Sequence, residues 1–77
     1  MSDKFADVVV HIDEDLSPED RITIQDGIRA LDGIVSVHNS SKTPHLTVVE
    51  YDIEEMDPHR ILKRVTDHGL HAELIGM

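Results

Sequence analysis

Two helix-start signals fix the order of structural elements in this chain. They are the pairs Ser17-Pro18 and Asp57-Pro58. A serine or aspartate side chain accepts a hydrogen bond from the unpaired N–H groups of a helix's first turn, and proline suits the first helical position because no N–H is needed there. The pairs therefore predict two helices. Because glycine is typical just past a helix end, the first is expected to end at Gly33 and the second at His68-Gly69.

Four short segments with several apolar residues flank these helices and predict strands. They are Val8–Ile12, Ile34–His38, His45–Tyr51 and Leu70–Ile75, with the polar segment Asn39–Pro44 as the turn between the second and third strands. The order βαββαβ with short connections predicts an α+β, ferredoxin-like sandwich. In it, an antiparallel four-stranded sheet of spatial order 4-1-3-2 carries both helices on one face. Residues 1–77 are expected to form a single domain, since the chain is too short for two.

Periodicity predicts which side chains face the core and which do not. Ile24, Ile28 and Leu31 follow the helical repeat and form one apolar stripe. Ile22 lies about 200° around the helix from Ile24, so it is expected to lie off the buried stripe, either exposed where a partner could contact it or packed under the adjacent loop. On the first strand, alternation places His11 on the open face of the sheet if the even-numbered residues 8–12 face the helices.

The same alternation surrounds His11 with a modest apolar patch. Its members are Val9, Leu46 and Val48. Such a patch indicates either a partner or self-association surface, or only the β-branched residues that strands favour.

Charge and composition exclude several functions. Seven Lys and Arg against 16 Asp and Glu give a formal net charge of -9, which repels phosphate backbones and anionic lipid, so nucleic-acid binding is not expected. The chain contains no cysteine, which rules out disulfides, iron–sulfur clusters and thiolate metal sites. The apolar run Val8–Val10 is too short for a signal sequence or a membrane span, so a cytoplasmic protein without membrane insertion is expected.

Three stretches together resemble one known family. They are Ile24-x3-Ile28-x2-Leu31-x-Gly33-Ile34-x2-Val37, Val49-x-Tyr51-Asp52 and Ile61-x6-His68-Gly69-Leu70-x-Ala72. Their joint spacing resembles the heavy-metal-associated, copper-chaperone-like domains, and the resemblance covers nearly the whole chain. It implies the same βαββαβ fold. In the family's register the two metal-binding cysteines fall on Ser17 and Asp20. Their hydroxyl and carboxylate oxygens are hard ligands, which do not replace thiolates in binding the soft ion Cu(I).

Histidines and carboxylates suggest a different metal site. In the predicted topology His38, His45, His68 and His71 lie near one pole of the sheet, together with Asp13 and Asp15. Imidazole and carboxylate suit Zn(II), Ni(II) or Cu(II). One interpretation is therefore a carrier or sensor of a divalent metal. The other is that these are solvated surface histidines on an acidic protein and that no cofactor is bound.

The same pole is acidic, and this favours a protein partner. We call the five carboxylates Asp13, Glu14, Asp15, Glu19 and Asp20 the acidic pole. The resemblance implies docking through this end with complementary charge, so the first hypothesis is an interaction module that binds a basic partner, with the exposed Ile22 in contact. The chain is expected to be a monomer or a weak homodimer.

Catalysis has no motif to support it. The sequence carries no phosphate-binding loop, nucleophile elbow or Ser-His-Asp signature, so the chain is not expected to be an enzyme. A third hypothesis is a small-molecule-sensing regulatory domain that dimerises through its sheet.

Overall fold

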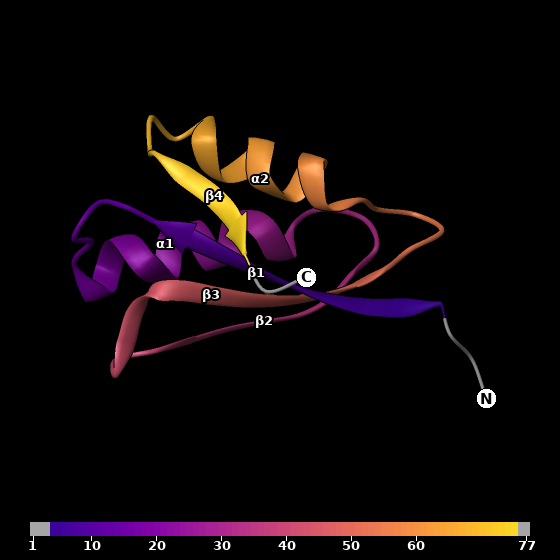
Figure 1. Ribbon diagram of the computed structural model, residues 1–77, viewed down its shortest axis with the longest axis horizontal. Coiled ribbons are helices and arrows are strands. Elements are labelled where there is room, and N and C mark those ends of the chain that lie inside the picture. The colour runs from indigo at the N-terminus through magenta and orange to yellow at the C-terminus, as the bar shows by residue number, and fades with distance from the viewer. Residues whose placement is uncertain (1–3, 76–77) are drawn as a thin grey trace.

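The computed structural model describes residues 4–75 (Figure 1). The elements in chain order are β1 (Phe5–Ile12), α1 (Pro18–Arg29), β2 (Ile34–Ser40), β3 (Thr43–Asp52), α2 (Pro58–Thr66) and β4 (Ala72–Ile75). The predicted order βαββαβ is therefore confirmed.

The four strands form one antiparallel sheet in the order β2-β3-β1-β4, which is the predicted order. β1 and β3 are central, while β2 and β4 form the edges. The register pairs His11 with Leu46, Ile12 with Ala72 and Ser40 with Thr43. The ends of β1 and β2 consequently lie at the same pole as the starts of β3 and β4. This is the arrangement that the sequence predicts.

One apolar core lies between the sheet and the two helices. Its fully buried side chains are Val8, Val10, Ile28, Val49, Ile61 and Val65. Because both helices contribute to one cluster with the inward residues of the strands, both pack on the same face. The predicted alternation is confirmed: Val8, Val10 and Ile12 are buried, whereas Val9 and His11 are only half-buried on the open face.

Both helix-start signals act as predicted. The Ser17 hydroxyl accepts a hydrogen bond from the Asp20 N–H at 3.1 Å, and the Asp57 carboxylate accepts one from the Arg60 N–H at 3.0 Å. Each following proline stands in the first turn. These caps fix where α1 begins and therefore where the loop after β1 must end.

The hairpin between β2 and β3 is tighter than predicted. The pairing of Ser40 with Thr43 leaves only Ser41 and Lys42 in the turn, instead of the whole segment Asn39–Pro44. Asn39 explains the difference, because its side-chain amide donates to the Leu46 carbonyl at 2.7 Å. The polar composition of Asn39–Pro44 therefore led to a turn prediction for residues that belong to the two strands.

The helix ends also differ from the prediction. α1 ends at Arg29 and α2 at Thr66, so Gly33 and Gly69 lie in the following turns. Both glycines have positive φ, +90° at Gly33 and +81° at Gly69, and this backbone conformation favours glycine.

Among residues 4–75, no helix is long and apolar enough to cross a membrane.

Candidate functional site

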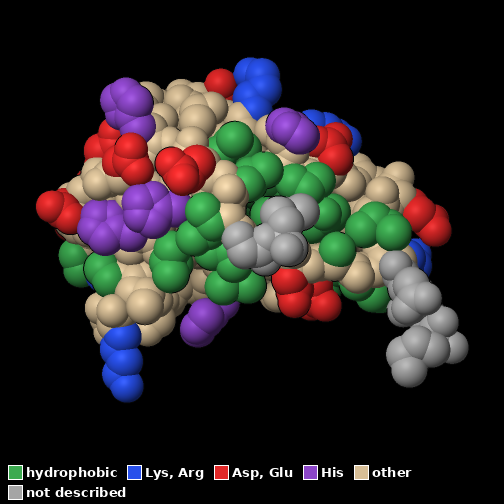
Figure 2. All heavy atoms as spheres, viewed as in Figure 1, with side chains coloured by type: hydrophobic (Ala, Val, Ile, Leu, Met, Phe, Trp, Pro, Cys, Tyr) green, Lys and Arg blue, Asp and Glu red, His purple; other side chains and the backbone are tan. Residues whose placement is uncertain are grey.

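The loop between β1 and α1 carries three consecutive carboxylates at the pole where the strands begin and end. They are Asp13, Glu14 and Asp15. The loop is anchored to the chain before β4, because the Asp13 N–H donates to the His71 carbonyl at 2.8 Å. Figure 2 shows acidic and histidine side chains gathered at one end of the molecule.

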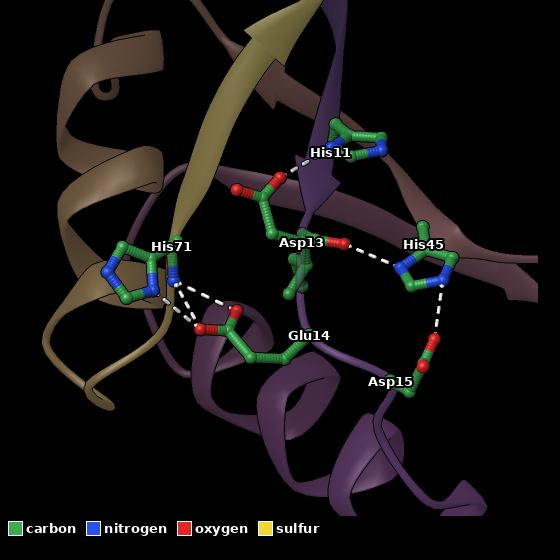
Figure 3. Close-up of polar contacts among 7 residues, drawn as sticks. His11, Asp13, Glu14, Asp15, His45 and His71 are labelled. Atoms are coloured by element: carbon green, nitrogen blue, oxygen red, sulfur yellow. Dashed lines mark hydrogen bonds and ion pairs between the residues drawn. The ribbon is translucent and has the colours of Figure 1, made fainter.

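Each of these carboxylates contacts a different histidine (Figure 3). His11 Nδ1 lies 3.2 Å from Asp13, His71 Nδ1 lies 2.7 Å from Glu14, and His45 Nε2 lies 2.9 Å from Asp15. The histidines come from β1, from the residue before β4 and from β3. Three separate parts of the sheet therefore hold one loop.

The contact of Glu14 with His71 is the most extensive of the three. The His71 backbone N–H also donates to both Glu14 oxygens, at 2.9 and 3.1 Å. The hydrogen bond to the His71 side chain, followed by that to its backbone, lowers the pKa of the Glu14 carboxyl. The same side-chain hydrogen bond and the charge of Glu14 raise the pKa of His71.

His45 is fixed by a backbone group as well as by a carboxylate. Its Nδ1 lies 2.7 Å from the Ile12 carbonyl oxygen. Because a carbonyl oxygen only accepts hydrogen bonds, Nδ1 carries a proton in this contact, and Nε2 needs a second proton to donate to the Asp15 carboxylate that it faces. The His45 ring also stacks on His11, with ring centroids 5.8 Å apart. The side chain of Asp15 is 95% exposed, so this contact lies at the surface.

His11 is a member of this arrangement that sequence reasoning missed. Alternation along the first strand placed His11 among the apolar residues of the open face. Alternation along the third strand placed His45 on the opposite face of the sheet. The ladder between β1 and β3 ends at the pair of His11 with Leu46. His45 lies one residue beyond that pair and is free to turn around the end of β1. Because His45 lies inside the predicted strand, the sequence gives no signal for this contact.

The predicted metal ligands do not converge. Among residues 4–75, no group of three or more His, Asp or Glu side chains is placed to hold a metal ion. His38 lies on edge strand β2, and His71 precedes β4 at the other edge. Three strand spacings of about 4.8 Å put the backbones of these two edges about 14 Å apart.

The other predicted ligands separate in the same way. His68 follows α2 and lines an open groove of about 230 Å³ with Leu16, Asp20, Thr23, Ile24 and Leu70. His45 and His71 contact different carboxylates, Asp15 and Glu14. The expectation of one shared ligand sphere is therefore not met, because the topology brings the histidines to one pole but to different positions across it.

The remaining carboxylates of the acidic pole, Glu19 and Asp20, lie exposed in the first turn of α1. Negative charge is favoured there by the helix dipole. Within residues 4–75, no Lys or Arg nitrogen lies within 4 Å of any carboxylate of the acidic pole. Within the same residues, the side-chain contacts of its loop carboxylates Asp13, Glu14 and Asp15 are with the three histidines.

Ile22 is 56% exposed beside this pole and lies off the buried stripe, as predicted. It lines an open groove of about 260 Å³ between α1 and the β2–β3 hairpin, together with Pro18, Arg21, Gln25, Asn39 and Ser41. Arg21 is turned toward the hairpin, where its guanidinium lies 3.4 Å from the Asn39 oxygen. The result is an exposed apolar side chain next to unpaired carboxylates.

Comparisons with known proteins show the fold. The sequence matches no protein-family model and no curated protein. Among solved structures, oxidized MerP from Ralstonia metallidurans CH34 is 18% identical with a TM-score of 0.83, over 94% of this chain and 99% of that chain. The yeast copper transporter domain Ccc2a is 24% identical with a TM-score of 0.80, over 91% and 94%. A putative copper-ion-binding protein from Bacillus anthracis str. Ames is 14% identical with a TM-score of 0.81, over 94% and 100%.

These structures share the fold of heavy-metal-associated domains, so the resemblance read from the sequence is confirmed at the level of the fold. The soft-metal site of that family does not fit this chain. Ser17, at one of the two expected cysteine positions, uses its oxygen to cap α1, and Asp20, at the other, offers a carboxylate. With no cysteine anywhere in the sequence, a thiolate site for Cu(I) cannot form here.

Proposed function

We propose that this chain is a non-catalytic interaction module that docks a basic protein partner through its acidic pole. The observation that carries the proposal is the set of carboxylates on the loop after β1 and the first turn of α1, none of which is paired with Lys or Arg in residues 4–75. Such a concentration of one charge attracts opposite charge and steers association. The neighbouring Ile22 adds an apolar contact at the edge of the surface.

The local structure suits docking because it is held before a partner arrives. The histidine contacts from β1, β3 and the start of β4 restrain the loop, and the Ser17 cap fixes its junction with α1. A restrained surface loses less conformational entropy on binding than a mobile one. The solved structures of the same fold include copper chaperone and transporter domains, and this chain keeps their scaffold without their thiolates.

A titration with a lysine-rich peptide tests this proposal. The double variant Glu19→Gln/Asp20→Asn should weaken peptide binding about two- to thirtyfold, because each exposed ion pair contributes about 0.2–1 kcal/mol. The matched control Asp7→Asn/Glu54→Gln changes the net charge equally at exposed positions outside the acidic pole. Equal weakening by the two variants would mean that only the net charge of -9 matters, and the proposal would be wrong.

A second candidate function, binding of a divalent metal ion, is favoured by one observation. The Nδ1–H of His45 is held by a backbone carbonyl while Nε2 faces Asp15, and this second-shell hydrogen bond is the kind that orients histidine ligands. Native mass spectrometry with Zn(II), Ni(II) and Cu(II) separates the two functions. The docking proposal expects no one-to-one complex below about millimolar metal. A tighter complex that is lost in His45→Ala/Asp15→Asn would favour the metal function instead.

A further inference from the structure

The exposed face of α2 forms a basic groove, which contrasts with the negative charge of the whole chain. Three of the seven Lys and Arg residues, Arg60, Lys63 and Arg64, fall within α2. With Leu31, Met56 and Asp67 they line an open groove of about 200 Å³, which we call the basic groove. A net charge of -9 makes a positive surface of this size unusual for the chain.

The two arginines of the basic groove keep their charge. Arg60 donates to the Glu55 carbonyl at 3.1 Å, and the Arg64 Nε–H donates to the Gly27 carbonyl at 3.1 Å. A carbonyl accepts a hydrogen bond but cancels no charge. Within residues 4–75, no carboxylate lies within 4 Å of either guanidinium.

Lys63 is paired with Asp67 at 3.2 Å, one turn along the helix. Both side chains are largely exposed, and exposed pairs of this kind bind weakly, so an incoming carboxylate can replace Asp67. The basic groove therefore presents up to three cations to a ligand.

The residues that line the basic groove suit a ligand that is apolar as well as negatively charged. Its floor is apolar, formed by the buried Met56 and the half-buried Leu31. The anchored guanidiniums are planar donors that suit carboxylates. The fitting ligand is therefore an acidic peptide segment with an apolar side chain close to its carboxylates.

We propose that the occupant of the basic groove is the acidic pole of a second copy of this chain. The loop Asp13–Asp15 and the first turn of α1, with Glu19 and Asp20, carry the carboxylates, and the exposed Ile22 supplies an apolar side chain beside them. Within residues 4–75 of one copy, no Lys or Arg pairs with the acidic pole and no carboxylate pairs with the arginines of the basic groove. Each surface supplies what the other lacks. This inference rests on the proposed function, and it names the basic groove of a second copy as the basic surface that the acidic pole docks.

The two surfaces cannot meet within a single copy. The acidic pole lies where α1 begins, whereas Leu31 follows the end of α1 and Arg60 lies in the first turn of α2. These are opposite ends of α1. Contact therefore requires two copies, with different surfaces facing each other, and this is the arrangement of a head-to-tail interface.

Sedimentation velocity at low salt tests the inference with two charge reversals. The wild-type chain should associate as its concentration rises, and Arg60→Glu or Asp15→Lys should each weaken association about two- to thirtyfold. Lys42→Glu and Asp7→Lys are the matched controls, since they make the same charge changes at exposed positions outside both surfaces. The controls should stay within about twofold of wild type.

Mixing the two reversal variants gives the decisive result. An equimolar mixture of Arg60→Glu and Asp15→Lys should associate again, because the first keeps an intact acidic pole and the second an intact basic groove. A mixture that stays monomeric, or a wild-type chain that stays monomeric at about millimolar concentration, overturns the inference. If that monomeric chain still binds the lysine-rich peptide at its acidic pole, only the self-association is wrong. If neither association is seen, the proposed function fails with it.

Discussion

Replacing Gly33 by alanine should destabilise the fold through two separate effects. Gly33 has φ of +90°, and left-handed backbone conformations cost a residue with a side chain roughly 1–2 kcal/mol. An added Cβ would also lie 2.9 Å from the Glu55 Cβ and 3.2 Å from the Met56 Cβ. Overpacking of this kind costs about 1–3 kcal/mol.

The turn opposite Gly33 cannot move away easily. Its backbone is held by Asp52, whose carboxylate accepts from the Glu54 N–H at 2.8 Å and whose carbonyl accepts from the Met56 N–H at 2.9 Å. Met56 is itself buried in the core. We therefore expect both effects to apply in full, with a loss of about 2–5 kcal/mol for Gly33→Ala.

Gly69→Ala is the matched control. Gly69 has φ of +81°, but nothing lies within 4 Å of an added Cβ, so only the backbone effect applies. Urea unfolding should give a loss of roughly 1–2 kcal/mol for Gly69→Ala, clearly smaller than that of Gly33→Ala. Equal losses for the two variants would show that the close approach of Gly33 to the Glu55–Met56 turn does not exist.

Four further substitutions have defined outcomes. Ser17→Ala and Asp57→Ala each remove a helix cap and should lower the free energy of unfolding by about 1 kcal/mol in urea titrations, and no change would refute the caps. Ile28→Ala, at a fully buried core position, should cost about 2–5 kcal/mol in the same assay, and a loss typical of surface sites would contradict the packing. The Glu14–His71 contact lowers the pKa of Glu14 and raises that of His71. The Glu14 contribution is present above its unfolded pKa near 4.5 and is lost as the pH falls through its lowered folded pKa. The His71 contribution is present below its unfolded pKa near 6.5 and is lost as the pH rises through its raised folded pKa. His71→Ala should therefore lower Tm most between these two unfolded values, and parallel Tm profiles for variant and wild type would exclude the contact.

The sequence predicts the fold well because its strongest signals are local. Ser17 and Asp57 cap helices through atoms within three residues, and strand alternation needs only one face to be buried. Boundaries were predicted less well. Asn39 reads as a turn residue, yet its amide bonds to the Leu46 carbonyl across the hairpin and extends both strands.

The candidate site was predicted in its location but not in its pairing. Topology alone brings the histidines and the acidic loop to one pole. The choice of partners depends on distances across the sheet and on side chains beyond the ladder. His45 turns around the end of β1 to meet His11 and Asp15, and neither contact follows from period-two alternation. The basic groove was also missed, because it joins α2 and the preceding Met56 to Leu31, which is distant in sequence.

Docking through the acidic pole is tested most directly by following backbone amide shifts of the ¹⁵N-labelled chain during titration with a lysine-rich peptide. The account predicts saturating shifts concentrated in residues 13–22, with little change at exposed carboxylates elsewhere, such as Asp7 and Glu54. Shifts spread evenly over all exposed carboxylates would contradict a defined docking surface.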